Sequence, residues 1–143
     1  MTPSRILPDL QCSLLCEDVK QEINGNLFLI GVINLIRVPQ LPIMAPKLCL
    51  LNRWTAGVGQ FVETIRMIGP DQSTVLRKSE NRFALQNATE NISTITFMAQ
   101  VKFETPGVYY FEVLVDDVMK LRFPLQLFVV PPEERPGAKP PQA

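Results

Sequence analysis

The chain contains no histidine among its 143 residues. Histidine provides the general base of Ser-His-Asp triads and Cys-His pairs, and many of the nitrogen ligands of zinc sites. Phosphate-binding glycine loops are also missing, since neither G-x-x-x-x-G-K nor G-x-G-x-x-G follows an expected strand. These absences exclude most familiar catalytic mechanisms, and we predict that the protein is not an enzyme.

An excess of charge of either sign is also lacking, because Lys and Arg total 14 and Asp and Glu total 14. Proteins that bind nucleic acids usually carry a basic excess, since neutralising phosphates provides much of their affinity. We therefore expect no nucleic-acid partner. A net charge of zero brings no self-repulsion, so it permits self-association into a homo-oligomer.

Cysteines are few, and their number is odd: Cys12, Cys16 and Cys49. An odd count without an export signal argues against a disulfide framework, and we expect three small core side chains. On an alternating strand, residues 12 and 16 would lie roughly 13 Å apart, which is too far to chelate one ion. The sequence therefore predicts no metal, cofactor or catalytic site.

Long apolar runs are missing as well. No segment approaches the ~20 apolar residues of a membrane span. Residues 1–18 contain one basic residue, Arg5, and no apolar run of the length found in a signal sequence. We therefore expect a cytoplasmic protein without a membrane partner.

What the chain does contain is enough apolar side chain for one core, at 46% hydrophobic residues. We predict a short extension over residues 1–8, a single domain over 9–130, and a disordered Pro-rich tail over 131–143.

A period of two dominates the second half of the chain, as expected for half-buried strands. In residues 93–103 we expect these apolar side chains to face inward: Ile95, Phe97, Ala99, Val101 and Phe103. Residues 108–115 and 119–129 alternate in the same way after short turns, so the three segments predict a meander. Pro124 cannot donate to a ladder, which predicts a sheet edge or a bulge there.

The first half is less regular. Residues 10–23 alternate loosely, as a strand or with a short helical turn, and Asn24-Gly25 is a hairpin signal. Residues 27–33 are apolar on both faces, which favours a central strand, and Gly31 within them indicates a bulge or a close backbone approach. Further strands are expected over residues 47–55 and 60–68, with two short ones near Val75 and Phe83.

Seven to nine short strands predict an antiparallel β-sandwich or a small barrel. Two features favour an immunoglobulin-like sandwich. Tyr109 lies two residues before the apolar Phe111 in the penultimate strand, as in a tyrosine corner, and Trp54 lies within an expected strand. The alternative is that these are ordinary core aromatics.

Two segments resemble a known family. Residues 16–22 read CEDVKQE and residues 25–32 read GNLFLIGV, and the segment from Pro106 to Leu125 is similar to the same family's ending. The resemblance is to uncharacterised bacterial proteins that begin with Cys-Asp, a basic residue, Glu, Gly-Lys and Leu-Ile-Gly-Val. This chain departs at Glu17, where the family has Asp, and at Asn26, where it has Lys. The resemblance implies a small sandwich and no assigned activity or site.

We predict a protein-interaction or structural module, in which free sheet edges pair with a partner or with a second copy. The candidate surface comprises Trp54, Met98, Tyr110, Leu114 and Phe128. One alternative is a small-molecule or carbohydrate-binding sandwich, which needs an exposed aromatic platform built from Trp54, Tyr109 and Tyr110. A second is an enzyme that uses carboxylates and arginine alone.

Overall fold

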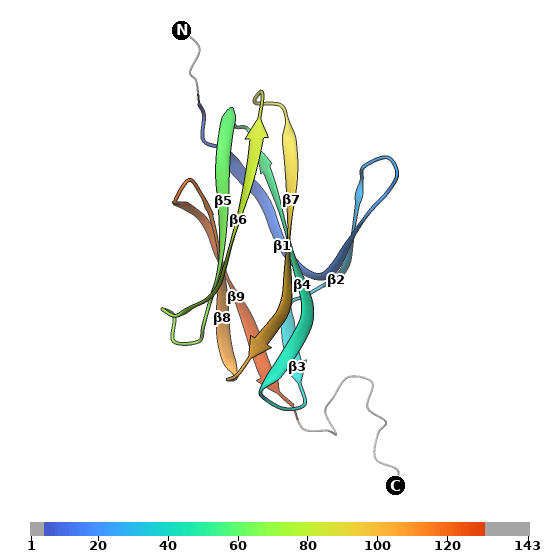
Figure 1. The fold of residues 1–143 in the computed structure, drawn as a ribbon, viewed down its shortest axis with the longest axis vertical. Coiled ribbons are helices and arrows are strands. Elements are labelled where there is room, and N and C mark those ends of the chain that lie inside the picture. The colour runs from blue at the N-terminus through green and yellow to red at the C-terminus, as the bar shows by residue number, and fades with distance from the viewer. Residues whose placement is uncertain (1–4, 131–143) are drawn as a thin grey trace.

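The structure is a computed structural model that describes residues 5–130. These residues form two facing β-sheets without a helix (Figure 1), so the predicted all-β sandwich class is confirmed. The strands are β1 (Asp9–Gln21), β2 (Leu27–Val32), β3 (Leu35–Val38), β4 (Ile43–Thr55), β5 (Gly59–Ile68), β6 (Val75–Leu85), β7 (Asn91–Phe103), β8 (Gly107–Val115) and β9 (Val118–Val129).

The strand order is β2-β1-β4-β7 in the four-stranded sheet and β3-β9-β8-β5-β6 in the five-stranded sheet. Within residues 5–130 no helix has the length and hydropathy needed to cross a membrane. The predicted disorder of residues 131–143 lies outside the described residues, as do residues 1–4 of the expected N-terminal extension.

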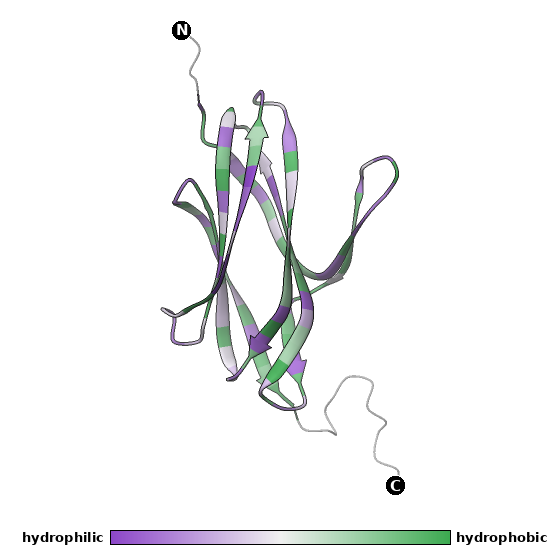
Figure 2. Cartoon of the chain, in the orientation of Figure 1, coloured by the Kyte–Doolittle hydropathy of each residue, from purple (hydrophilic) through white to green (hydrophobic). Residues whose placement is uncertain are grey.

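The core fills the space between the two sheets because alternate side chains on each strand are apolar, an alternation that Figure 2 shows as changing colour along the strands. Trp54, Phe103, Tyr109 and Phe111 are its largest fully buried side chains. Trp54 stacks on Phe83 at 5.4 Å, and Phe103 meets Tyr109 edge-on at 5.1 Å. Removing apolar surface from water at roughly 25 cal/mol per Å² makes these aromatics the main stabilising contacts.

The chain changes sheets between β7 and β8. The expected three-strand meander is therefore wrong for β7, which belongs to the four-stranded sheet, whereas β8 and β9 pair as predicted in the other sheet. The phenol of Tyr109 fixes this corner by donating a hydrogen bond of 2.6 Å to the backbone carbonyl of Thr105. At the other end of β8, Asp116 and Asp117 turn the chain with φ values of 46° and 67°, as a tight hairpin requires.

The predicted faces of β7 are wrong in its first half. Met98 is 1% exposed, whereas Phe97 is 56% exposed, so the interior phase is the reverse of the one expected there. The phase changes at Gln100, whose φ is 53°, opposite the proline of β4, Pro46, which has no N–H to donate. Beyond this irregularity Val101 faces inward as predicted. The residues placed on the wrong face are Ile95, Phe97 and Ala99.

Two further strand predictions have different outcomes. Residues 75–85 form the single strand β6 rather than two short strands, and β6 pairs with β5 from Leu85 to Val75 with one register shift, between Met67 and Ile68. Pro124 lies on β9 opposite Tyr110, before the parallel pairing of β9 with β3 begins at Gln126. The sheet edge predicted at Pro124 is therefore confirmed.

Candidate functional site

The five residues predicted as an interaction surface do not form one surface. Trp54 and Met98 lie on inner faces of β4 and β7 and are buried in the core, which corrects their predicted exposure. Leu114 is also buried, on the central strand β8, which corrects its predicted exposure. Tyr110 is half-buried, and Phe128 on β9 is 43% exposed.

The aromatic platform considered for a sugar ligand is likewise not formed by these residues. Trp54 and Tyr109 are buried, and the ring of Tyr110 is covered by the guanidinium of Arg122 at 4.3 Å from its centroid. A flat, exposed pair of rings, which stacking on a sugar requires, is absent at these three positions.

Strand β2 is the most exposed apolar element of the described chain. It was predicted to be a central strand, but it is the edge of the four-stranded sheet and pairs only with β1. Phe28, Ile30 and Val32 on one side of it are 53%, 42% and 48% exposed. The prediction of a central strand was wrong because both faces of β2 are apolar but only one is covered. The rest of its hairpin and the sheet cover that face, and the other face remains open.

The covered side of β2 belongs to a second, smaller apolar cluster. Leu27 and Leu29 pack against the buried Cys16, Val19 and Cys49. The hairpin of β1 and β2 is therefore anchored to the four-stranded sheet at its base. Its turn extends away from the sandwich as an arm (Figure 1). We refer to residues 18–32 as the arm.

Two contacts at the base of the arm fix its direction. Lys47 on β4 donates a hydrogen bond of 2.8 Å to Asp18, and this bond is the main reason that the pKa of Asp18 is lowered and that of Lys47 is raised. Gly31 has φ +66°, and a Cβ there would lie 2.6 Å from the carboxylate of Glu17. The close approach predicted for Gly31 is therefore confirmed, and its left-handed φ favours glycine at this position.

A groove of about 710 Å³ lies between the arm and the outer side of the sheet. Leu14, Leu51 and Ile95 provide apolar lining, and Arg53 and Asn91 provide polar groups at its margin. Apolar lining with a few polar groups is typical of ligand and peptide sites. The groove therefore lies on the Leu27 and Leu29 side of β2, opposite the exposed side chains of the same strand.

A buried carboxylate lies in the core, away from the arm. Glu63 on β5 is fully buried, and its Oε2 accepts hydrogen bonds from the side chains of Asn52, Trp54 and Thr94 at 3.0, 2.5 and 2.6 Å. Its Oε1 accepts a bond of 2.8 Å from Asn81. Because Glu63 is closed to solvent and to any substrate, we assign it a structural role. Its hydrogen bonds join the two sheets. Its position in phase with Phe61, Ile65 and Met67 was the sequence signal that could have revealed it.

The cysteines do not assemble into a reactive centre. Cys16 and Cys49 are paired across β1 and β4 and are both free and buried, and burial raises the pKa of both thiols. A buried thiol of raised pKa is a poor nucleophile and a poor metal ligand. Among residues 5–130 there is no group of three acidic or cysteine side chains arranged to hold a metal ion.

Comparison with known proteins places this sandwich in a family without assigning an activity. No curated protein matches the chain. A family profile does match, over residues 11–128, which is most of the chain and includes both sheets and the arm. On this match the chain belongs to the Family of unknown function (DUF6941).

Proposed function

We propose that this protein is a non-enzymatic protein-interaction module that binds an extended partner segment along the free edge of β2. The observation that carries the proposal is that the six residues of this edge strand include no charged side chain. A free edge presents unpaired backbone N–H and C=O groups, which an added strand satisfies.

The other edge strands support the proposal by contrast. Proteins protect free edges with charged residues, short strands or bulges. Strand β6 contains four charged residues, and β3 is only four residues long and includes Arg37. Strand β7 includes Lys102. Among the four edges of the described chain, β2 alone has none of the charges that discourage pairing.

The exposed side chains of β2 define the chemistry of the partner. Phe28, Ile30 and Val32 alternate along one side, so a partner strand would present apolar residues at every second position. A second copy of the chain meets this requirement, because an antiparallel pair centred on Ile30 sets Phe28 opposite Val32 of the other copy. Self-association and binding of another protein are therefore two forms of the same edge pairing.

We further propose that the sandwich is of the immunoglobulin-like type. The order β1-β4-β7 in one sheet and β5-β8-β9 in the other follows the arrangement of strands A, B and E and strands C, F and G in that fold. The Tyr109 hydrogen bond at the start of β8 supports this assignment, since a tyrosine corner occurs at the start of strand F. Such sandwiches serve as binding scaffolds with many unrelated partners, so the assignment is independent of any activity.

The test compares the wild type with Ile30→Lys and Phe97→Lys in affinity purification from the native cell extract, and in sedimentation of the purified protein. Both positions are exposed and apolar, at 42% and 56%, but only Ile30 lies on the proposed edge. We expect a stoichiometric partner, or a second copy, with the wild type and with Phe97→Lys, and loss of it with Ile30→Lys. Equal retention by both variants, equal loss by both, or a wild type that is monomeric and binds nothing would overturn the proposal.

A further inference from the structure

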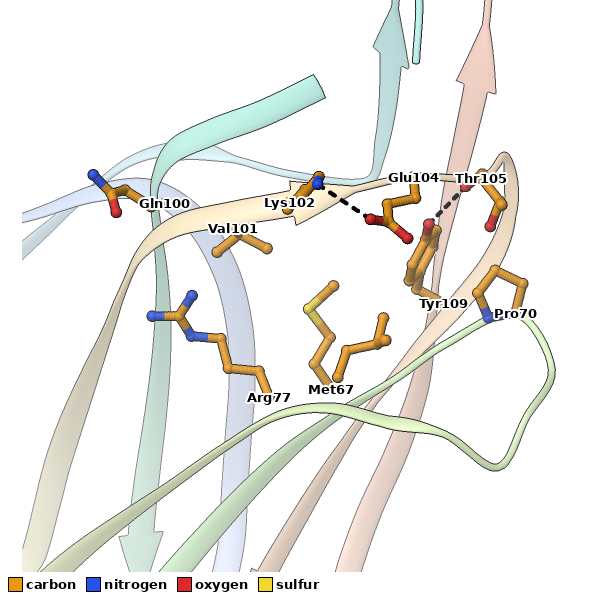
Figure 3. A pocket seen from close by; sticks show the side chains of 10 residues that line it. Met67, Pro70, Arg77, Gln100, Val101, Lys102, Glu104, Thr105 and Tyr109 are labelled. Carbon is orange, nitrogen blue, oxygen red and sulfur yellow. Dashed lines mark hydrogen bonds and ion pairs between the residues drawn. The ribbon is translucent and has the colours of Figure 1, made fainter. Parts of the chain in front are cut away.

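A pocket of about 370 Å³ opens between the two sheets at the end of the molecule opposite the Asp116-Asp117 turn (Figure 3). Met67 on β5, Val101 on β7 and Tyr109 on β8 line its inner wall, and all three belong to the main core. Pro70 and Thr105, in the two connections at this end, close its outer side. The pocket therefore joins an apolar interior to solvent, at a volume within the range of small-molecule sites.

Two of the three charged residues that line the pocket are basic. Arg77 on β6 and Lys102 on β7 line it from the two sheets, with the amide of Gln100 beside them. Lys102 forms an ion pair of 3.2 Å with Glu104, which is the only acidic group lining the pocket. Arg77 forms no ion pair with any residue in the range 5–130 and is half-buried. The described lining thus includes one half-buried arginine without a counter-charge.

A guanidinium without a counter-charge is well suited to a carboxylate. Its planar N–H groups match the two oxygens of a carboxylate, and it is hydrated more weakly than an ammonium group. An anion here would also accept from the amide of Gln100. The same anion would lie over Met67 and Val101, against which an attached apolar group would lose contact with water.

The backbone at Gln100, opposite Pro46, is also unusual at this place. Its φ of 53° is in the left-handed region, which a residue with a side chain seldom adopts. Conformations of this kind persist where the surroundings enforce them, and they are concentrated at ligand sites. Here the irregularity reverses the facing of β7 and brings Val101 inward and Gln100 to the rim.

We propose that this pocket binds a small amphipathic carboxylate, with its anionic group at Arg77 and Gln100 and its apolar part against Met67, Val101 and Tyr109. The site lies between β6 and β7, on strands other than the β2 edge, so it does not depend on the partner proposed for that edge. A small ligand of this class is distinct from a sugar, because the pocket offers an apolar wall and a cation rather than an exposed ring platform.

The experiment titrates the full chain with octanoate and follows backbone amide shifts by NMR, with octylamine as the cationic probe of equal chain length. Arg77→Met removes the charge and keeps the apolar stem. Lys78→Met is the matched control, because Lys78 is the next residue of β6, is exposed and pairs with Glu80 instead. Glu104→Gln removes the one carboxylate that repels the anion.

We expect octanoate to bind with a Kd of about 1 mM or below and to shift amides near Met67, Arg77 and residues 100–105. Arg77→Met should weaken this binding about tenfold or more, Lys78→Met should leave it unchanged, and Glu104→Gln should strengthen it. No saturable shift with octanoate, equal binding of octylamine, or equal weakening by the two β6 variants would overturn the proposal. None of these results bears on the β2 edge, which the Ile30→Lys comparison tests separately.

Discussion

Replacing Glu63 by alanine should destabilise the sandwich more than any surface substitution. The side chains of Asn52 and Trp54 would lose their acceptor in the closed interior, whereas Asn81 would keep its bond of 2.8 Å to Thr96. Each buried N–H left without a partner costs about 1–3 kcal/mol, and the lost side-chain volume adds to this. We therefore expect a loss of about 3–5 kcal/mol, against a total stability of about 5–15 kcal/mol for a domain of this kind.

Glu63→Gln should be far milder, and this contrast distinguishes a hydrogen-bonding role from a general effect of size. If the glutamine oxygen takes the place of Oε2, it still accepts from Asn52 and Trp54. Its NH₂ group would then face Asn81, whose amide can turn and offer its oxygen instead. We expect Glu63→Gln to lie within about 1 kcal/mol of the wild type.

Urea denaturation followed by far-UV circular dichroism measures both variants without relying on the Trp54 signal, which the substitution perturbs directly. With a slope of about 1–3 kcal/mol per M, Glu63→Ala should lower the midpoint by about 2 M. Glu104→Ala is the matched control, because that side chain is exposed and its ion pair with Lys102 lies at the surface. A loss of under about 1 kcal/mol for Glu63→Ala, or equal losses for alanine and glutamine, would refute the reasoning.

Three further predictions concern single side chains. A thiol reagent at neutral pH should modify Cys12, which is partly exposed. It should not modify Cys16 or Cys49, because burial raises the pKa of both thiols. Mass spectrometry counts the modified cysteines, and three in the native protein would contradict this prediction. Hydrogen bonds from a threonine hydroxyl and two backbone N–H groups lower the pKa of Asp71 to about 2. The stability that this carboxylate contributes is therefore present above pH ~4 and lost as the pH falls towards 2. Asp71→Asn should flatten the fall of Tm over that interval, and an unchanged slope would refute the assignment. Tyr109→Phe should lower the free energy of unfolding by about 1 kcal/mol, because it removes the hydrogen bond at the corner between β7 and β8. Tyr110→Phe should leave the free energy of unfolding almost unchanged. Equal losses for the two variants would contradict the role of Tyr109.

The parts of the fold that depend on local sequence pattern could be predicted from the sequence. Alternation placed Tyr109 and Phe111 in the interior of β8, and Pro124 marked a sheet edge, since each depends on one strand and its immediate chemistry. The turn at Asp116 was predicted for the same reason. Which sheet a strand joins is not a local property, and β7 was therefore grouped with β8 although a corner separates them.

The reversed face of β7 has a specific cause. Thr96 is polar, and a period-two pattern assigns it to solvent, but it is buried beside the amide of Asn81, which belongs to the network around Glu63. A polar partner on another strand made the interior suitable for a threonine, and no pattern within β7 records that partner. Because Thr96 faces inward, its neighbour Phe97 faces outward and is exposed. Part of the candidate surface was consequently predicted on the wrong side of its strand.

The arm raises the question of why an apolar edge strand remains ordered without a second neighbour. Its order comes from the covered side, where Leu27 and Leu29 pack into the small apolar cluster, and from the bond between Asp18 and Lys47 at its base. The open side, which includes Ile30, contributes little to that packing. One side of β2 therefore stabilises the arm, and the other side is exposed. Ile30→Lys should weaken edge pairing and leave the urea midpoint close to that of the wild type. A variant that lost both together would show that the open side holds the arm in place, and that its exposure is not an interaction surface.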